Sequence, residues 1–317
     1  MSDEDEIMSK DIDDSRRDFV RNSLYTVGAI GGLSLAGSSG ANAASAAETP
    51  VGENVMPKNS YPMYTPRSGY EAGDLQWREG RYVGGAPIGI LQFPANIPMM
   101  PGNVGNASTF DFPVIYHQLL DIDLCAMIEG RSSKEDIARF IEGAKALEAQ
   151  GVRAIGANCG FWANYQREIA EAIDVPFVSS SLVQIPWLLN ILKPAQKIMV
   201  FTFDAELMEK VPALQSVGVQ DRSRLVIQSG NTSKEFNRIG ALEGAFDPAK
   251  FGEELVNIIS STYTKHPEVG AVLLECTELT PFAWAVQEAT GLPVFDAITP
   301  VKWMHSGIVQ SPYYGHL

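Results

Sequence analysis

Two stretches of this sequence match each other without gaps at a spacing of 117 residues, and this repeat constrains the fold more than any other feature. Residues 151–177 and 268–294 are identical at six aligned positions: Val152 and Val269, Ala154 and Ala271, Cys159 and Cys276, Glu171 and Glu288, Ala172 and Ala289, Pro176 and Pro293. Matched apolar positions alone could arise in any two strand–helix–strand units. A joint match of Cys, Glu and Pro at one offset indicates an internal duplication, so we expect two similar halves.

From Pro87 onward, apolar runs alternate with amphipathic segments, as is typical of parallel α/β proteins. We expect strands over 88–93, 124–128, 153–159, 175–180, 197–203, 224–230, 271–276 and 292–298. The segments between them predict helices near 112–120, 134–150, 162–173, 181–192, 205–217, 248–265 and 281–290. Together with the repeat, this pattern predicts an α/β fold of two pseudo-symmetric parallel-sheet lobes with the site in the cleft between them.

The same pattern predicts how the chain is divided. We expect a first lobe over 87–190, a second lobe over 191–298 and a C-terminal segment, 299–317, that returns to the first lobe. Residues 44–86 are rich in Pro, Gly, Ser and Tyr without a clear period, which indicates an exposed linker or a strap laid over the fold.

The first 43 residues read as a targeting segment. Ser15–Arg21, "SRRDFVR", resembles the twin-arginine export signal, and the apolar stretch Leu24–Gly37 that follows is too short for a comfortable membrane span. Small residues at 41–43 and at 44–46 offer two cleavage sites. We therefore expect residues 1–43 to be a twin-arginine signal peptide that engages the export machinery, and the mature protein to be periplasmic or extracellular.

Composition removes several function classes. A formal net charge of −14 argues against nucleic acid as a partner. Three cysteines without a CxxC pair are too few for a disulfide scaffold, and the four histidines show no metal-ligand spacing, so no metal site is expected. Nucleotide-binding, serine-hydrolase and zinc-protease motifs do not occur in the sequence.

The repeat places one thiol at corresponding positions in each half. Cys159 and Cys276 each end an apolar strand and precede a helix, and ligands bind at that end of parallel sheets. A helix N-terminus favours a thiolate, and the amides after each Cys can hold a substrate carboxylate. Two thiols facing each other across a cleft could remove and supply protons on opposite sides of one carbon. The alternative is that each Cys is a small buried hydrophobe, which is the role we expect for Cys125.

These residues resemble the aspartate/glutamate racemase superfamily, which includes amino-acid and hydantoin racemases, maleate isomerase, arylmalonate decarboxylase and algal-type dimethylsulfoniopropionate lyases. The resemblance covers roughly Pro87 to Ile308. The stretch "ECTEL" looks like the second catalytic motif of the superfamily, which implies a catalytic Cys276 with Thr277 and Glu278 holding the substrate. The first motif is usually Cys-Asn-Thr in the amino-acid racemases.

In this chain the first motif is Cys159-Gly160-Phe161, which disfavours an amino-acid substrate. The resemblance implies a catalytic Cys159 with Asn158, Gly160 and Phe161 around the substrate. The stretches that look most like the dimethylsulfoniopropionate lyase branch are "NCGFW", "LLECTEL", "GLPVFDAIT" and "PGNVGNASTFDFP". The resemblance further implies no metal and no organic cofactor.

Three functions stay open at this point. The first is a cofactor-independent enzyme that moves a proton at the carbon next to a carboxylate, either as a racemase or isomerase of a small carboxylic acid or as a dimethylsulfoniopropionate lyase. The second is an exported solute-binding protein, since two α/β lobes around a cleft also suit ligand capture. The third, a thiol redox protein, is disfavoured by the absence of CxxC. A homo-oligomer and a monomer are both compatible with the sequence.

Other residues have weaker indications. Asn158 and Glu275 precede the two thiols and could tune them, and Ser179–Ser181 and Asp296 follow strands that correspond in the repeat. The long loop 94–109 could cover the cleft as a lid or simply connect elements. We expect His305 to serve packing or surface, and Trp162, Trp187, Trp284 and Trp303 to pack helices onto the sheets.

Overall fold

A computed structural model describes residues 84–93, 97–313 and 315–316. The chain divides after Val55 into two units, and every described residue belongs to the second, Met56–Leu317. The signal peptide predicted over 1–43 lies outside the described residues, as does the predicted linker up to residue 83.

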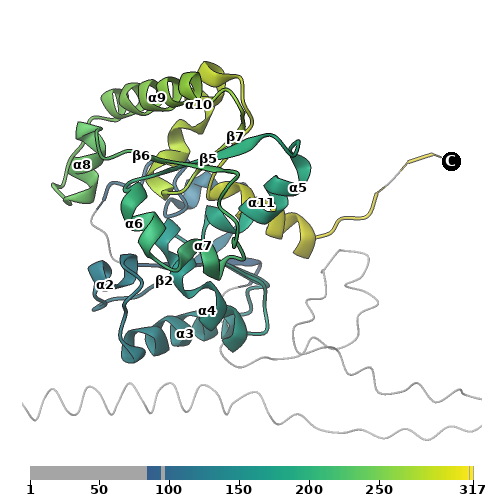
Figure 1. Ribbon diagram of the computed structural model, residues 1–317. Coiled ribbons are helices and arrows are strands. Elements are labelled where there is room, and N and C mark those ends of the chain that lie inside the picture. The colour runs from purple at the N-terminus through teal and green to yellow at the C-terminus, as the bar shows by residue number, and fades with distance from the viewer. Residues whose placement is uncertain (1–83, 94–96, 314, 317) are drawn as a thin grey trace, which may run out of the picture. The chain divides into compact units, whose positions relative to one another are not determined.

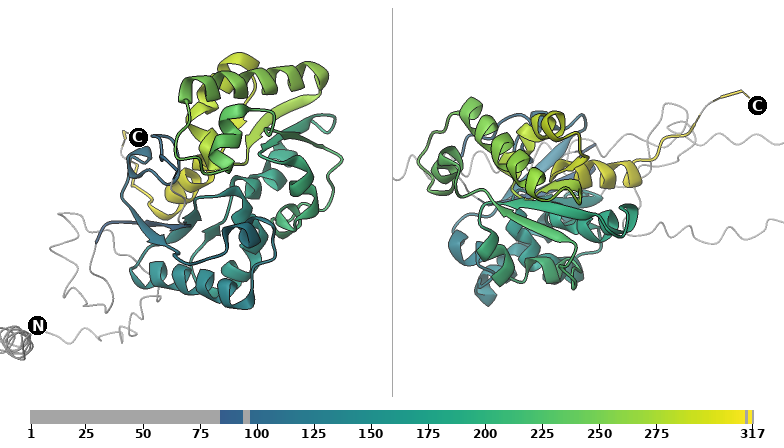
Figure 2. Two further views of the ribbon diagram at one scale, coloured as in Figure 1. Left: turned by 90° about the vertical axis from the view of Figure 1, so that its left-hand side faces the viewer. Right: turned by 45° about the horizontal axis from the view of Figure 1, so that its top comes forward.

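The described residues form two sheets of four parallel strands (Figures 1 and 2). The first sheet has the order β2-β1-β3-β4 and contains β1 (Ile88–Gln92), β2 (Val114–Gln118), β3 (Ala154–Ala157) and β4 (Phe177–Val178). The second has the order β6-β5-β7-β8 and contains β5 (Lys197–Thr202), β6 (Leu225–Ser229), β7 (Val269–Leu274) and β8 (Val294–Phe295). Because the two strand orders correspond, the predicted α/β fold of two pseudo-symmetric lobes is confirmed.

Helices cover both sheets. In the first half these are α2 (Leu124–Ile128), α3 (Lys134–Ala149), α4 (Gln166–Ala172) and α5 (Ile185–Ile191), with short 3₁₀ helices η2 (Ala107–Thr109), η3 (Gly160–Tyr165) and η4 (Ser181–Gln184). In the second half they are α6 (Ala205–Lys210), α7 (Ala213–Ser216), α8 (Lys234–Gly240), α9 (Pro248–Lys265), α10 (Ala283–Thr290) and α11 (Ile298–Ile308), with the 3₁₀ helix η5 (Thr277–Phe282). The ends of α3 and α9 match the prediction closely because each begins at a side-chain cap, Ser133 and Asp247.

The structural repeat extends further than the sequence match. η3 and η5 begin and end 117 residues apart, and so do the segment from η4 to α5 and the helix α11. The two equivalent segments exchange sheets. Leu182, Ile185 and Leu188 pack with Ile198 and Val200 of the second sheet.

Helix α11 makes the reciprocal exchange, because it packs on the first sheet. Ile298, Val301 and Met304 join a buried cluster with Ile88 and Ile90 of β1. Such an exchange buries apolar area from each half against the other, which holds the two lobes together through the hydrophobic effect.

The sequence-based reading was wrong in one region of the first lobe. The segment expected as a helix, 112–120, contains strand β2, and the strand expected at 124–128 is helix α2. Asp123 caps α2 by accepting a hydrogen bond from the amide of Ala126 at 2.9 Å, which starts a helix in a short apolar run that has no period of its own. Cys125 is consequently exposed on α2 and is not the buried residue we expected.

Two other expectations fail for similar local reasons. Helix α8 lies between the strand expected at 224–230 and the helix expected at 248–265, where we predicted no element, and Ser233 caps it through the amide of Phe236. Of the four tryptophans expected to pack helices onto the sheets, Trp162 is buried, whereas Trp187, Trp284 and Trp303 are 55%, 68% and 74% exposed. Hydrophobicity alone did not show which face of a helix these rings occupy.

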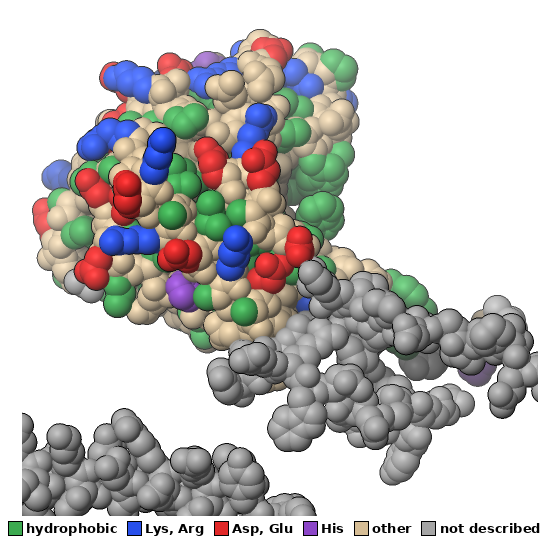
Figure 3. Space-filling view, turned by 90° about the horizontal axis from the view of Figure 1, so that it is seen from below, with side chains coloured by type: hydrophobic (Ala, Val, Ile, Leu, Met, Phe, Trp, Pro, Cys, Tyr) green, Lys and Arg blue, Asp and Glu red, His purple; other side chains and the backbone are tan. Residues whose placement is uncertain are grey.

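The surface seen from below carries acidic and basic side chains interspersed with apolar ones (Figure 3). None of the helices over the described residues combines the length and the apolar character needed to cross a membrane.

Candidate active site

Both repeat-related thiols lie at the carboxyl ends of central strands. Cys159 follows β3 and directly precedes η3, while Cys276 follows β7 and directly precedes η5. Both have extended backbone conformations and remain partly exposed at these ends. The elements after the thiols begin as 3₁₀ turns, so the expected α-helical N-terminus is replaced by a tighter one.

The segments that carry the two thiols contact each other directly. The hydroxyl of Thr277 donates to the carbonyl oxygen of Asn158 at 2.8 Å, and the hydroxyl of Ser181 donates to the carbonyl oxygen of Glu275 at 3.4 Å. Both bonds join one lobe to the other at the residue before a thiol. The lobes are therefore joined directly beside the two thiols.

A carboxylate lies against one of the thiols. The Cys276 thiol donates to Oε2 of Glu278 at 2.8 Å, and the side-chain Nδ2 of Asn103 donates to Oε1 of the same carboxylate at 3.4 Å. The hydroxyl of Thr277 also lies 3.2 Å from Oε2. Glu278 is thus placed to accept the thiol proton. That Thr277 and Glu278 hold the substrate stays a prediction.

Burial and acidic neighbours disfavour both thiolates. Burial is the main cause that raises the pKa of the Cys276 thiol well above its usual value, followed by the charges of Glu278 and Glu275 and the charge of Cys159. Burial likewise raises the pKa of the Cys159 thiol, followed by the charge of Glu275, and the amides of Phe161 and Trp162 oppose this increase. The expectation that helix N-termini favour thiolates is therefore outweighed in the protein without substrate.

Asn158, Gly160 and Phe161 surround Cys159 in different ways. The Asn158 side chain is buried and accepts from the amide of Phe93 at 3.2 Å, and no described residue bonds its Nδ2. The Phe161 ring belongs to a core cluster against which Cys159 also packs, and the Phe161 amide hydrogen-bonds the thiol. Gly160 packs against Glu275 of the other lobe. A direct contact of these three residues with substrate stays a prediction.

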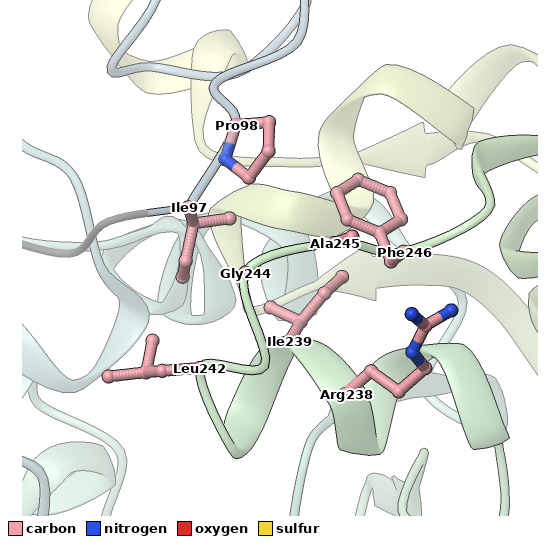
Figure 4. A pocket seen from close by; sticks show the side chains of 8 residues that line it. All are labelled: Ile97, Pro98, Arg238, Ile239, Leu242, Gly244, Ala245 and Phe246. Atoms are coloured by element: carbon pink, nitrogen blue, oxygen red, sulfur yellow. The ribbon is translucent and has the colours of Figure 1, made fainter.

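The connection after β1 crosses from the first lobe to the second. Ile97 and Met100 pack against the second lobe's core, and a Cβ on Gly102, whose φ is +99°, would lie 2.9 Å from Cα of Pro281. Figure 4 shows a small pocket where Ile97 and Pro98 of this connection meet Arg238, Ile239, Leu242 and residues 244–246 of the second lobe. From Ile97 onward this connection is thus anchored on the second lobe beside η5. A lid role for it stays a prediction.

Asn103 is the residue in this connection that sequence reasoning missed. Its side chain is 2% exposed, accepts from the amide of Gly105 at 2.7 Å and donates to Glu278, while its carbonyl oxygen accepts from Thr109 at 2.7 Å. The signal available in the sequence was a Gly-Asn pair repeated at 102–103 and 105–106, which indicates ordered turns but not which side chain turns inward.

Replacing Asn103 with alanine should lower the free energy of unfolding by about 1–3 kcal/mol, because buried partners lose their hydrogen bonds. Urea unfolding of the full chain measures this loss. Ser108→Ala, on the exposed turn of the same connection, is the matched control and should stay within about 0.5 kcal/mol of the parent. Equal effects of the two substitutions would show that Asn103 does not anchor the connection.

Two further candidates have structural roles. Oδ1 of Asp296 accepts from the amides of Ile298 and Thr299 at 3.0 Å, so this side chain starts α11. The His305 ring stacks on Phe112 with centroids 3.7 Å apart, which agrees with the expected packing role, and burial lowers its pKa.

Comparisons with known proteins identify relatives of this chain. No family model matches it. The chain is 29% identical over 236 residues to a dimethylsulfoniopropionate lyase of Durusdinium sp. clade D, covering 73% of this chain and 77% of the relative. It is also 29% identical over 235 residues to dimethylsulfoniopropionate lyase 7 of Emiliania huxleyi (strain CCMP1516), covering 72% and 69%.

Among solved structures, the glutamate racemase of Francisella tularensis subsp. tularensis SCHU S4 in complex with D-glutamate matches with a TM-score of 0.44 and 15% identity. The match covers 73% of this chain and 86% of that one. A likeness at this level says nothing about activity.

Proposed function

We propose that this protein, which resembles the aspartate/glutamate racemase superfamily and is similar in sequence to its dimethylsulfoniopropionate lyases, cleaves dimethylsulfoniopropionate into dimethyl sulfide and acrylate. The observation that carries the proposal is the Cys276–Glu278 pair at the end of β7, across the lobe contact from Cys159. A thiol that is hydrogen-bonded to a carboxylate becomes a thiolate once its proton has moved to that carboxylate, and the thiolate can act as a general base.

The reaction needs one proton abstraction and one bond cleavage. The Cys276 proton passes to Glu278, and the resulting thiolate removes a proton from the carbon next to the substrate carboxylate. The electron pair of that C–H bond forms the C=C double bond, and the pair of the neighbouring C–S bond leaves with sulfur. Neutral dimethyl sulfide, acrylate and one proton are the products, so atoms and charge balance.

The charges around Cys276 favour a substrate with a cationic end. Besides burial, the charge of Glu278 raises the pKa of this thiol, and Glu275 adds to the effect once it ionises above about pH 8. A sulfonium group bound nearby would offset this negative charge and favour the thiolate. A dicarboxylate such as maleate would instead bring more negative charge toward Glu278. The amides that follow each Cys are the proposed partners of the substrate's single carboxylate. Thr277 holds the second of these segments in place through its hydrogen bond to Asn158.

Proton NMR in D2O tests the proposal on the protein that lacks residues 1–43. The protein is mixed separately with dimethylsulfoniopropionate, aspartate, glutamate, a hydantoin and maleate. We expect acrylate and dimethyl sulfide from the first compound only. Deuterium entering an α position without cleavage would instead indicate a racemase, and fumarate from maleate an isomerase. Tight binding without turnover that survives Cys276→Ser would favour a solute-binding protein.

A further inference from the structure

Glu275 is a buried acidic residue that precedes Cys276 and contacts Gly160, the residue after Cys159, and the proposed reaction moves no proton through it. It follows β7 directly, corresponds to Asn158 in the repeat and is 1% exposed. Its amide donates to the carbonyl oxygen of Phe201 at 2.9 Å, and its carbonyl oxygen accepts from Ser181. The backbone of Glu275 is therefore held by both β5 and η4.

The side chain of Glu275 is held on one side only. The hydroxyl of Thr202 donates to Oε2 at 2.9 Å, whereas Oε1 is buried and has no hydrogen-bond partner among the residues that the structure describes. A charged carboxylate left half unpaired in the interior would be very unfavourable. The carboxyl is neutral at pH 7 for this reason: burial raises its pKa to about 8.

The unpaired oxygen fills a space that the opposite lobe leaves open. A Cβ built on Gly160 would overlap the Glu275 carboxyl group and lie 2.7 Å from its carbonyl oxygen. Because Gly160 has no side chain, the Glu275 carboxyl group can reach the segment that carries Cys159. The two residues form one interlocking contact across the lobes, next to both thiols.

We propose that Glu275 is a positioning residue for the thiol pair, a buried carboxyl that seats against Gly160 and couples its own ionisation to that of Cys159 and Cys276. This inference rests on the proposed function, because it takes the two thiols as the reacting groups. The titratable groups that act on Glu275 or are acted on by it are Glu278 and the two thiols, and Thr202 is its neutral partner.

The coupling has a defined sign and pH range. Below about pH 8 the Glu275 carboxyl keeps its proton and adds no charge beside the thiols. Above that pH it ionises, and its negative charge raises the pKa of both thiols and opposes their deprotonation. Glutamine in its place has a similar shape and no charge at any pH, so only the alkaline range should change.

Alkylation by iodoacetamide tests this inference on the full chain, with each thiol quantified by mass spectrometry between pH 6 and 10. In Glu275→Gln we expect alkylation of Cys276 at pH 9.5 to be faster than in the parent by about tenfold, equal to one unit of thiol pKa, and unchanged at pH 6.5. Cys159 should change in the same direction. The exposed Cys125 provides the internal reference, and Glu171→Gln, an exposed repeat position, is the matched control.

A pH-independent change or no change at Cys276 and Cys159 would overturn the coupling. Should Glu275→Gln fail to fold, Thr202→Val supplies the second test. Loss of the Thr202 donor keeps the carboxyl neutral to higher pH, so alkylation of both thiols should accelerate near pH 9 and not at pH 6.5; an unchanged profile in this variant would also overturn the coupling. Because alkylation needs no substrate, absence of lyase turnover would contradict the proposed function without affecting this result.

Discussion

Replacing Cys276 with serine should reduce cleavage of dimethylsulfoniopropionate by about 10³-fold or more, because general-base catalysis of this kind contributes about 10²–10⁴-fold and a hydroxyl is far harder to ionise than a thiol. Serine is only slightly smaller than cysteine and its hydroxyl can still donate to Glu278, so the fold should remain intact. Gas chromatography of dimethyl sulfide measures the loss, and circular dichroism checks the fold.

The matched control for this substitution is Cys125→Ser, since Cys125 is exposed on α2 and its change should alter turnover by no more than about twofold. Cys159→Ser tests whether cleavage needs one thiol or both. Elimination of a neutral leaving group needs no second proton transfer to carbon, so we expect a loss of only about ten- to a hundredfold. Equal, complete losses for Cys159→Ser and Cys276→Ser would contradict Cys276 as the single base and show that cleavage requires both thiols.

Much of this architecture could be predicted from the repeat. The match of Cys159 with Cys276 at one offset placed both thiols at corresponding strand ends, and the structure shows them there with the lobes joined beside them. The periodic segments α3 and α9 were also located correctly because their caps and apolar stripes agree. For these two helices, an apolar stripe over several helical turns was sufficient to locate the element.

Short segments were less predictable. The run 124–128 is apolar throughout and five residues long, so its helical state depends on the Asp123 cap and on packing that the sequence does not display. The same limit applies to the site. Asn103 reaches Glu278 across 175 residues of sequence, and the contact of Gly160 with Glu275 is created only when the lobes meet. Such contacts are tertiary and leave no periodic signal.

Glu278→Gln should change thiol reactivity and turnover in opposite directions. The charge and hydrogen bond of Glu278 raise the pKa of Cys276, so the glutamine variant should lower that pKa and accelerate alkylation of Cys276 at pH 8. Turnover should nevertheless fall by about 10²-fold, because glutamine cannot accept the thiol proton and offers no charge to a sulfonium group.

Faster alkylation together with slower turnover would distinguish a catalytic carboxylate from one that only shapes the pocket. A residue that merely packs beside Cys276 would alter both readouts in parallel, through local disorder, whereas a proton acceptor is needed during turnover and hinders the free thiolate. Glu288→Gln, on the exposed face of α10, should change neither rate by more than about twofold. If Glu278→Gln kept full turnover while alkylation rose, the thiol would not depend on Glu278 for its proton transfer, and water would have to accept that proton instead.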